Sequence, residues 1–186
     1  MQLRPGMSVI PFVLPLYNGE PWDLSSLKGQ PYLLSFFRFA ACPFCNLRLH
    51  YLVEQFEQLP ENFTIVAIFE SSLAEVQRYA GRHQSPFPIL ADDGGVWHDR
   101  YSVQQSWWGT IKGMIGRFPT LMKAMLVDGY WPRSIGGKMN TMPADFLVDY
   151  GGVIREVHYG KDEGDHLGFE KIKAFAWEQH RLHSMN

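Results

Sequence analysis

Residues 32–45 read YLLSFFRFAACPFC and join an apolar run to a closely spaced cysteine pair. Residues 32–37 are almost continuously apolar, which is typical of a strand buried in the centre of a sheet. Pro43 suits the first position of a helix, because the N–H that it lacks would have no partner there. The segment predicts a strand, a short loop and a helix, with Cys42 at the point where the helix begins.

Strand and helix signals alternate on both sides of this segment, which predicts an α/β fold with a mixed sheet between helices. We expect strands at 9–16, 63–69, 88–91, 144–148 and 153–158, and helices at 43–58, 72–82, 96–101 and 167–182. The first of these strands forms an N-terminal β extension. Asp92 and Asp93 are interpreted as turn formers.

Residues 102–140 interrupt this order and are predicted to form a helical insertion. Apolar residues from Trp107 to Met125 follow a helical period, and Pro119 should kink that helix. Three interpretations stay open: a wall over the redox site, a homodimer interface, and a basic amphipathic helix on a membrane surface.

The composition limits the classes of protein that this chain can represent. Its 186 residues are 46% hydrophobic and fit one domain, 1–186. A net charge of -2 argues against nucleic-acid binding, and two cysteines are too few for a disulfide scaffold. The opening MQLRPGMSVI lacks the apolar core of a secretory signal, and there is no run of 18 apolar residues. We therefore expect a cytoplasmic protein without a membrane span.

The spacing of Cys42 and Cys45 predicts thiol chemistry. A thiol at a helix start faces unpaired N–H groups, and with a CxxC partner its pKa falls from about 8.5 to roughly 3.5–7.5. Arg38 and Arg48 are candidates for adding positive potential. Cys45 falls on the apolar stripe of the helix. We expect Cys42 to be the accessible nucleophile and Cys45 the shielded thiol that resolves a mixed disulfide.

Two other interpretations of the cysteine pair stay open. A zinc site needs two further ligands, with His50 as the nearest candidate, and Asn46 after Cys45 removes the haem-attachment pattern CxxCH. In the second interpretation, Cys42 and Cys45 are ordinary cysteines near a helix terminus and carry no chemistry. Our expectation is that the chain holds no metal and no organic cofactor.

The segments FFRFAACPFCNLRL (36–49) and TMPADFLVDYGGVIREVHYG (141–160) resemble the thioredoxin superfamily, and more closely its AhpC/TSA, peroxiredoxin-like branch. The resemblance implies a thioredoxin-like fold in which Cys42 and Cys45 form the redox-active disulfide. It also implies that a cis Met142–Pro143 bond faces the CxxC motif. Met142 and Pro143, together with Pro43 and Phe44, would then dock the substrate.

The chain departs from this pattern at several positions. Phe39 and Ser35 stand where peroxiredoxins carry Thr or Ser and Pro, and that hydroxyl orients the peroxide. The buried acid of thioredoxin is missing, since Phe36 and Phe37 fill the strand. We therefore expect a thiol–disulfide oxidoreductase that draws electrons from a thioredoxin- or glutathione-type donor. The alternatives are an antioxidant thiol peroxidase acting on peroxide, and a non-enzymatic redox sensor or interaction module.

A few other polar residues carry weaker signals. Glu70 ends the second buried strand and is interpreted as a solvated side chain, or else as a proton acceptor for Cys45. His158 and His166, with the acids between them, suggest either a metal loop or a glycine-rich connector.

Overall fold

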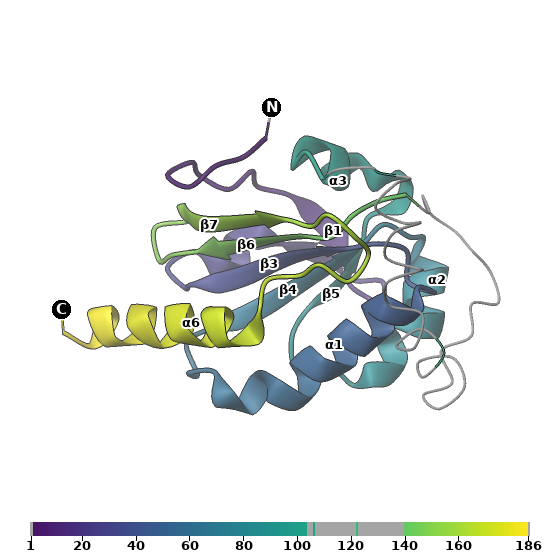
Figure 1. Cartoon of the computed structure of the whole chain (residues 1–186). Helices are drawn as coiled ribbons and strands as arrows, with labels where there is room; N and C mark the ends of the chain where they lie inside the picture. The colour runs from purple at the N-terminus through teal and green to yellow at the C-terminus, as the bar shows by residue number, and fades with distance from the viewer. Residues whose placement is uncertain (1, 104–105, 107–121, 123–139, 186) are drawn as a thin grey trace.

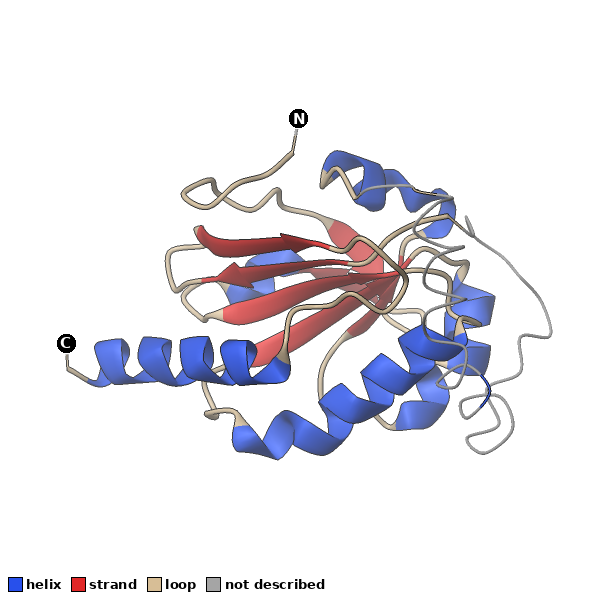
Figure 2. Ribbon diagram, viewed as in Figure 1, coloured by secondary structure: helices blue, strands red, loops and turns tan. Residues whose placement is uncertain are grey.

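The computed structural model describes residues 2–103, 106, 122 and 140–185. Within these residues a five-stranded sheet forms the centre of the molecule, with the strand order β5-β4-β3-β6-β7 (Figures 1 and 2). The strands are β3 (Tyr32–Phe37), β4 (Thr64–Phe69), β5 (Ile89–Ala91), β6 (Ala144–Val148) and β7 (Ile154–Tyr159). β3, β4 and β5 pair in parallel, whereas β6 is antiparallel to both β3 and β7.

Helical elements cover the sheet. The α-helices are α1 (Pro43–Gln55), α2 (Leu73–Tyr79), α3 (Val96–Arg100) and α6 (Phe169–Ser184). The short 3-10 turns are η1 (Leu24–Leu27), η2 (Phe56–Gln58), η3 (Gly81–His83) and η4 (Asp93–Gly95). A separate two-stranded sheet joins β1 (Val13–Pro15) to β2 (Pro21–Asp23).

Two apolar cores lie on opposite faces of the sheet because neighbouring strand residues point to opposite sides. Phe37 belongs to the core that α1, α2 and α6 cover, and Cys42 and Cys45 lie in that same core. Phe36 belongs to the core covered by the N-terminal segment, where Tyr101 packs against its ring. β3 is buried along its whole length, as its apolar run predicts.

The expected order of elements is confirmed, with differences at the edges. The N-terminal strand is only three residues long: it begins after Pro11, and Pro15 is its last residue. β2 was not expected from the sequence. The helical insertion and its kink at Pro119 lie mostly outside the described residues. None of the helices described is long and apolar enough to cross a membrane.

Candidate active site

Cys42 sits at the N-cap of α1, just beyond the carboxyl end of β3. Pro43 occupies the first turn of the helix, as expected, and Cys42 keeps an extended backbone with φ of -66° and ψ of 122°. The loop is held by its own backbone, since the Cys42 N–H donates to the Phe39 carbonyl at 3.0 Å. The N–H of Ala40 donates to the Ser71 hydroxyl at 2.9 Å. These bonds fix the Cys42 thiol at the positive end of the helix.

The surroundings of Cys42 favour its thiolate. Burial opposes ionisation, but a hydrogen bond from the Cys45 thiol, the charge of Arg38 and backbone N–H groups outweigh it and lower the Cys42 pKa to about 6. The Arg38 guanidinium is 3.7 Å from the sulfur, measured from Nη1 to Sγ. The Cys42 thiolate is therefore stabilised both by the start of α1 and by the buried guanidinium of Arg38.

Cys45 has the opposite character. Its own burial and the neighbouring Cys42 raise the pKa of its thiol well above the usual value. The two sulfurs are unpaired, so the structure shows the dithiol form. The expectation that Cys42 is accessible is wrong, since both cysteines are 1% exposed. Residues 39–41 of the preceding loop lie in the same core as both cysteines, so charge rather than exposure distinguishes the thiols.

Arg48 lies elsewhere than expected. Its Nη2 donates to the Leu167 carbonyl at 2.7 Å, and the negative charge that it faces is Asp145. Arg38 is therefore the cation beside Cys42, and Arg48 ties α1 to the segment before α6. The expected docking residues are covered in the structure: Pro43, Phe44, Met142 and Pro143 are all buried.

The side chain of Asn46, the residue after Cys45, holds the loop that leads into α1. Its side-chain amide donates to the Ala40 carbonyl at 2.7 Å and to the Cys42 carbonyl at 2.9 Å. Because two carbonyls fix the amide nitrogen, the amide oxygen faces His83 and accepts from Nε2 at 3.0 Å. Burial, together with the charges of Arg82 and His50, lowers the His83 pKa to about 4. Sequence reasoning missed this link.

We expect Asn46→Ala to lower the free energy of unfolding of the reduced protein by about 1–3 kcal/mol, because two buried carbonyls lose their donor. His83→Gln keeps a donor for Asn46 and should cost less. The stability that neutral His83 contributes is complete above pH 6.5 and is lost as the pH falls towards about 4. Urea unfolding between pH 4 and 7 measures both effects. A stable Asn46→Ala protein, or an unchanged pH dependence in His83→Gln, would contradict this account.

Glu70 and Thr141 connect two strand ends at the edge of the sheet near the cysteines. Glu70 is 3% exposed, so its interpretation as a solvated side chain is wrong. Its carboxylate accepts a hydrogen bond from the Thr141 hydroxyl, which directly precedes the Met142–Pro143 bond. That bond is trans, and the cis expectation is therefore wrong. Trans is the ordinary state of an X-Pro bond, and the Gly160 N–H holds the Pro143 carbonyl at 2.8 Å.

A buried acid does lie behind the site, although the sequence predicted none. Asp145 on β6 is fully buried and accepts from the Ser35 hydroxyl at 2.5 Å and the Leu167 N–H at 2.7 Å. His166 Nδ1 lies 3.1 Å from the same carboxylate. Burial opposes the charge, but His166, Arg48 and Ser35 hold the Asp145 pKa well below its usual value. The histidine expected in a metal loop or a connector is thus a partner of this acid.

Asp92 and His98 form a second buried pair. The Asp92 carboxylate accepts from the N–H groups of Trp97 and His98 at 2.9 Å each and contacts His98 Nδ1 at 2.7 Å. The other ring nitrogen of His98 lies 2.9 Å from the Phe37 carbonyl, next to Arg38. Asp92 therefore accepts from the N–H groups at the start of α3, and His98 fastens this helix to the end of β3. Among the described residues, no three His, Cys, Asp or Glu side chains gather as a metal site would require.

Comparison with known proteins agrees with this geometry. The model of the AhpC/TSA family matches residues 5–157. The chain belongs to the AhpC/TSA family. Similar curated members of this family are the chloroplastic peroxiredoxin Q of Sedum lineare, 26% identical over 109 residues, and that of Triticum aestivum, 24% identical over 103 residues. These matches cover 58% and 55% of this chain, and 59% and 48% of the relatives, so the chain spans about half of their length.

Solved structures of AhpC/TSA-like and thioredoxin-like proteins share the fold. The peroxidoxin BcpB of Mycobacterium tuberculosis superposes with a TM-score of 0.69 at 18% identity, covering 95% of this chain and 98% of that one. A thiol:disulfide interchange protein DsbE from Chlorobium tepidum gives 0.61 at 18% identity, covering 94% and 99%. The expected thioredoxin-like fold is confirmed.

Proposed function

We propose that this chain is a thiol–disulfide oxidoreductase in which Cys42 attacks and Cys45 resolves. The observation that carries the proposal is the opposite shift of the two thiols: the Cys42 pKa falls to about 6, whereas the Cys45 pKa rises. At neutral pH one sulfur is a thiolate beside Arg38, and its neighbour keeps a proton. A nucleophile and a protonated resolving thiol in one helical turn are what dithiol exchange requires.

The reaction balances with these two sulfurs. The Cys42 thiolate attacks a disulfide R–S–S–R′, forms a mixed disulfide with R–S and releases R′–S⁻. Cys45 then gives up its proton, attacks the Cys42 sulfur and releases R–S⁻. The substrate gains two electrons, and the enzyme is left with a Cys42–Cys45 disulfide. A thioredoxin- or glutathione-type donor returns two electrons and restores the dithiol.

Peroxide is the second candidate substrate, favoured by the similarity to peroxiredoxin Q and to peroxidoxin BcpB. The Cys42 thiolate would take the terminal oxygen of a hydroperoxide and become a sulfenic acid, while the peroxide leaves as an alcohol or water after protonation. Cys45 would then form the disulfide with loss of water. Phe39 offers no hydroxyl to the peroxide, and the Ala40 N–H is already bonded to Ser71. These two features favour disulfides over peroxides.

We expect the alkylation rate of Cys42 by iodoacetamide to rise with pH and to reach half its maximum near pH 6. Arg38→Met should move this midpoint up by about 1–3 units, because the thiolate loses an adjacent positive charge. Arg100→Met changes an exposed arginine on α3 and is the matched control. Mass spectrometry of quenched samples identifies the labelled cysteine. An unchanged midpoint in Arg38→Met, or first labelling at Cys45, would refute the assignment.

The choice of substrate is tested by stopped-flow oxidation of the reduced protein with hydrogen peroxide and, in parallel, with oxidised glutathione and an insulin-type disulfide. We expect faster oxidation by the disulfides. Phe39→Thr, which supplies a hydroxyl, should accelerate the peroxide reaction and leave disulfide exchange unchanged. Faster peroxide oxidation in the unaltered protein would identify a peroxidase. Oxidation without turnover by either donor type would identify a redox sensor.

We place the protein in a reducing, cytoplasmic compartment, where a closely spaced cysteine pair is more often catalytic than structural. We propose two roles for residues 102–140. The segment forms either a wall over the redox site or the contact with a second copy of the chain. Sedimentation of the full chain and of a variant with this segment replaced by a Gly/Ser linker tests the dimer.

A further inference from the structure

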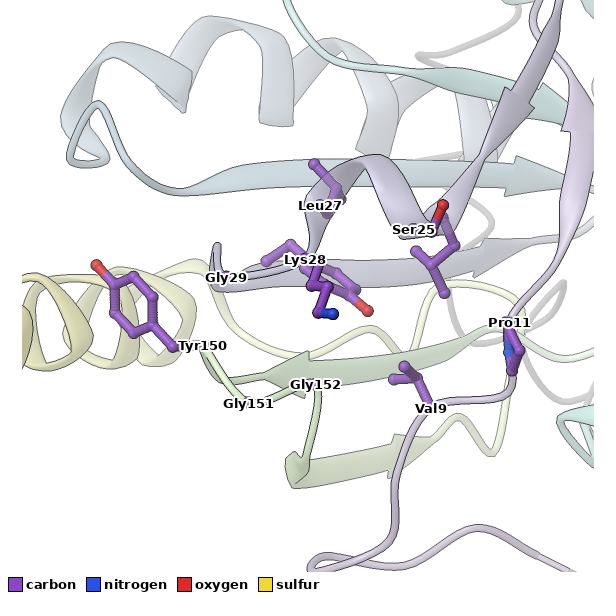
Figure 3. Close-up of a pocket in the computed structure, with 11 residues that line it drawn as sticks. Val9, Pro11, Ser25, Leu27, Lys28, Gly29, Tyr150, Gly151 and Gly152 are labelled. Atoms are coloured by element: carbon purple, nitrogen blue, oxygen red, sulfur yellow. The ribbon is translucent and has the colours of Figure 1, made fainter.

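A pocket lies at the end of the sheet opposite the cysteines (Figure 3). Tyr32, at the start of β3, forms part of its wall, whereas Cys42 follows the end of that strand. The six residues of β3 separate the two places by roughly 17 Å of strand. Neither cysteine lines this pocket, so it is distinct from the redox site.

The walls of the pocket are mainly apolar. Val9 and Pro11 come from the N-terminal segment, Leu24 from η1 and Gly152 from the turn between β6 and β7. The cavity measures about 360 Å³, which is within the range of about 300–1,000 Å³ that small-molecule sites occupy. A rigid body of two fused aromatic rings, or a chain of similar size, suits this space.

Two polar groups at this pocket have no hydrogen-bond or ion-pair partner among the described residues. Lys28 is exposed, and its ammonium has no ion pair or hydrogen bond among the described residues. Figure 3 shows the Lys28 side chain between η1 and the Gly151–Gly152 turn. Tyr32 is 3% exposed, and within the described part of the chain its hydroxyl makes no hydrogen bond either. The pocket thus offers one cation and the hydroxyl of a buried tyrosine.

The other polar groups nearby are already paired. The Asp149 carboxylate accepts from Arg155 Nε at 2.5 Å and from the N–H groups of Gly151 and Val153 at 2.9 Å each. The Tyr150 hydroxyl points away from the pocket in Figure 3 and bonds to Asn62. Burial and the charge of Asp149 raise the pKa of Tyr32, so its hydroxyl stays protonated and is available as a donor. Lys28 is the lining residue that carries a charge.

We propose that this pocket binds a small carboxylate with an apolar body. The carboxylate would accept from the Lys28 ammonium and the Tyr32 hydroxyl, while the apolar body lies against Val9, Pro11 and Leu24. An ammonium with an unpaired charge selects an anion, and a neighbouring hydroxyl donor adds the second hydrogen bond that one carboxylate can accept. The site does not depend on the redox function.

The test uses 2-naphthoate as the probe and its neutral counterpart 2-naphthamide as the matched ligand. The reduced full chain, labelled with ¹⁵N, is titrated with each, and the amide signals of Gly29, Gly151 and Gly152 are followed. We expect naphthoate to shift these signals saturably and to bind about tenfold more tightly than naphthamide. Lys28→Met should remove this preference, and Tyr32→Phe should weaken naphthoate about tenfold. Cys42→Ser should bind as the unaltered protein does.

Lys161→Met, at an exposed lysine beyond β7, is the matched control and should bind naphthoate normally. Equal affinity for the two ligands, or unchanged naphthoate binding in Lys28→Met, would show that the pocket binds the apolar body alone and does not recognise the carboxylate. Either result would overturn the proposal. Absence of saturable shifts up to about 10 mM would overturn it as well. If Tyr32→Phe fails to fold, Lys28→Met decides the outcome, because that side chain is exposed.

Discussion

Cys42→Ser is expected to lower the rate of disulfide reduction by at least about a thousandfold, because the nucleophile is removed. Cys45→Ser keeps the nucleophile and its Arg38 neighbour, so the first attack continues. Without a resolving thiol the attack product stays attached, and mixed disulfides accumulate on Cys42. Non-reducing mass spectrometry after incubation with oxidised glutathione measures the trapped adduct.

The two single variants serve as controls for each other, since each removes one sulfur from the same buried site. Cys42→Ser should trap little glutathione, because the pKa of Cys45 is raised and its thiol stays protonated at neutral pH. Equal trapping by both variants would contradict the assignment of Cys42 as the nucleophile and Cys45 as the resolving thiol. Full activity in Cys42→Ser would remove Cys42 from the mechanism.

Asp145→Ala should give the largest loss of stability. The substitution leaves the Ser35 hydroxyl, the Leu167 N–H and His166 without their acceptor inside the protein. Removing one partner of a buried charged pair typically costs about 3–5 kcal/mol. Urea unfolding of the reduced protein at neutral pH measures this loss. The difference between the two proteins should shrink as the pH falls below about 3.8, because Asp145 then takes up a proton in the unfolded chain, whereas its pKa in the fold lies well below that value.

Glu156→Gln is the control for Asp145→Ala. Glu156 on β7 pairs with Lys171 in an exposed contact, and surface ion pairs contribute about 0–1 kcal/mol. We therefore expect little change in its unfolding midpoint. A loss below about 1 kcal/mol in Asp145→Ala would show that the cluster around Asp145 does not support the fold.

The centre of the fold is predictable from the sequence because its signals are local. The apolar run of β3 and the proline after Cys42 each specify their element without reference to distant residues. The helix start predicts a low pKa at Cys42, and in the structure the Cys45 thiol, Arg38 and backbone N–H groups lower it. Of the two arginines expected to add positive potential, Arg38 lies beside Cys42 and Arg48 does not.

The polar support behind the site was missed because its partners are far apart in the chain. Asp145 interrupts the otherwise apolar strand ADFLV, and an acid in a buried strand signals that a partner must exist. Nothing local identifies that partner, since Ser35 lies 110 residues away. Glu70 looked solvated for the same reason, because Thr141 joins it from 71 residues away. The sequence around a residue predicts whether its side chain is exposed only when the residues that cover it are also close in the chain.

The bond between Arg48 and the Leu167 carbonyl has a consequence for synthesis on the ribosome. It spans 119 residues, so this tie between α1 and the segment before α6 forms only after residue 167 has emerged. Contacts between residues so far apart form late, because closing the long loop between them costs chain entropy before the contact stabilises the fold. The two thiols are thus synthesised well before the bond that ties their helix to the segment before α6 can form.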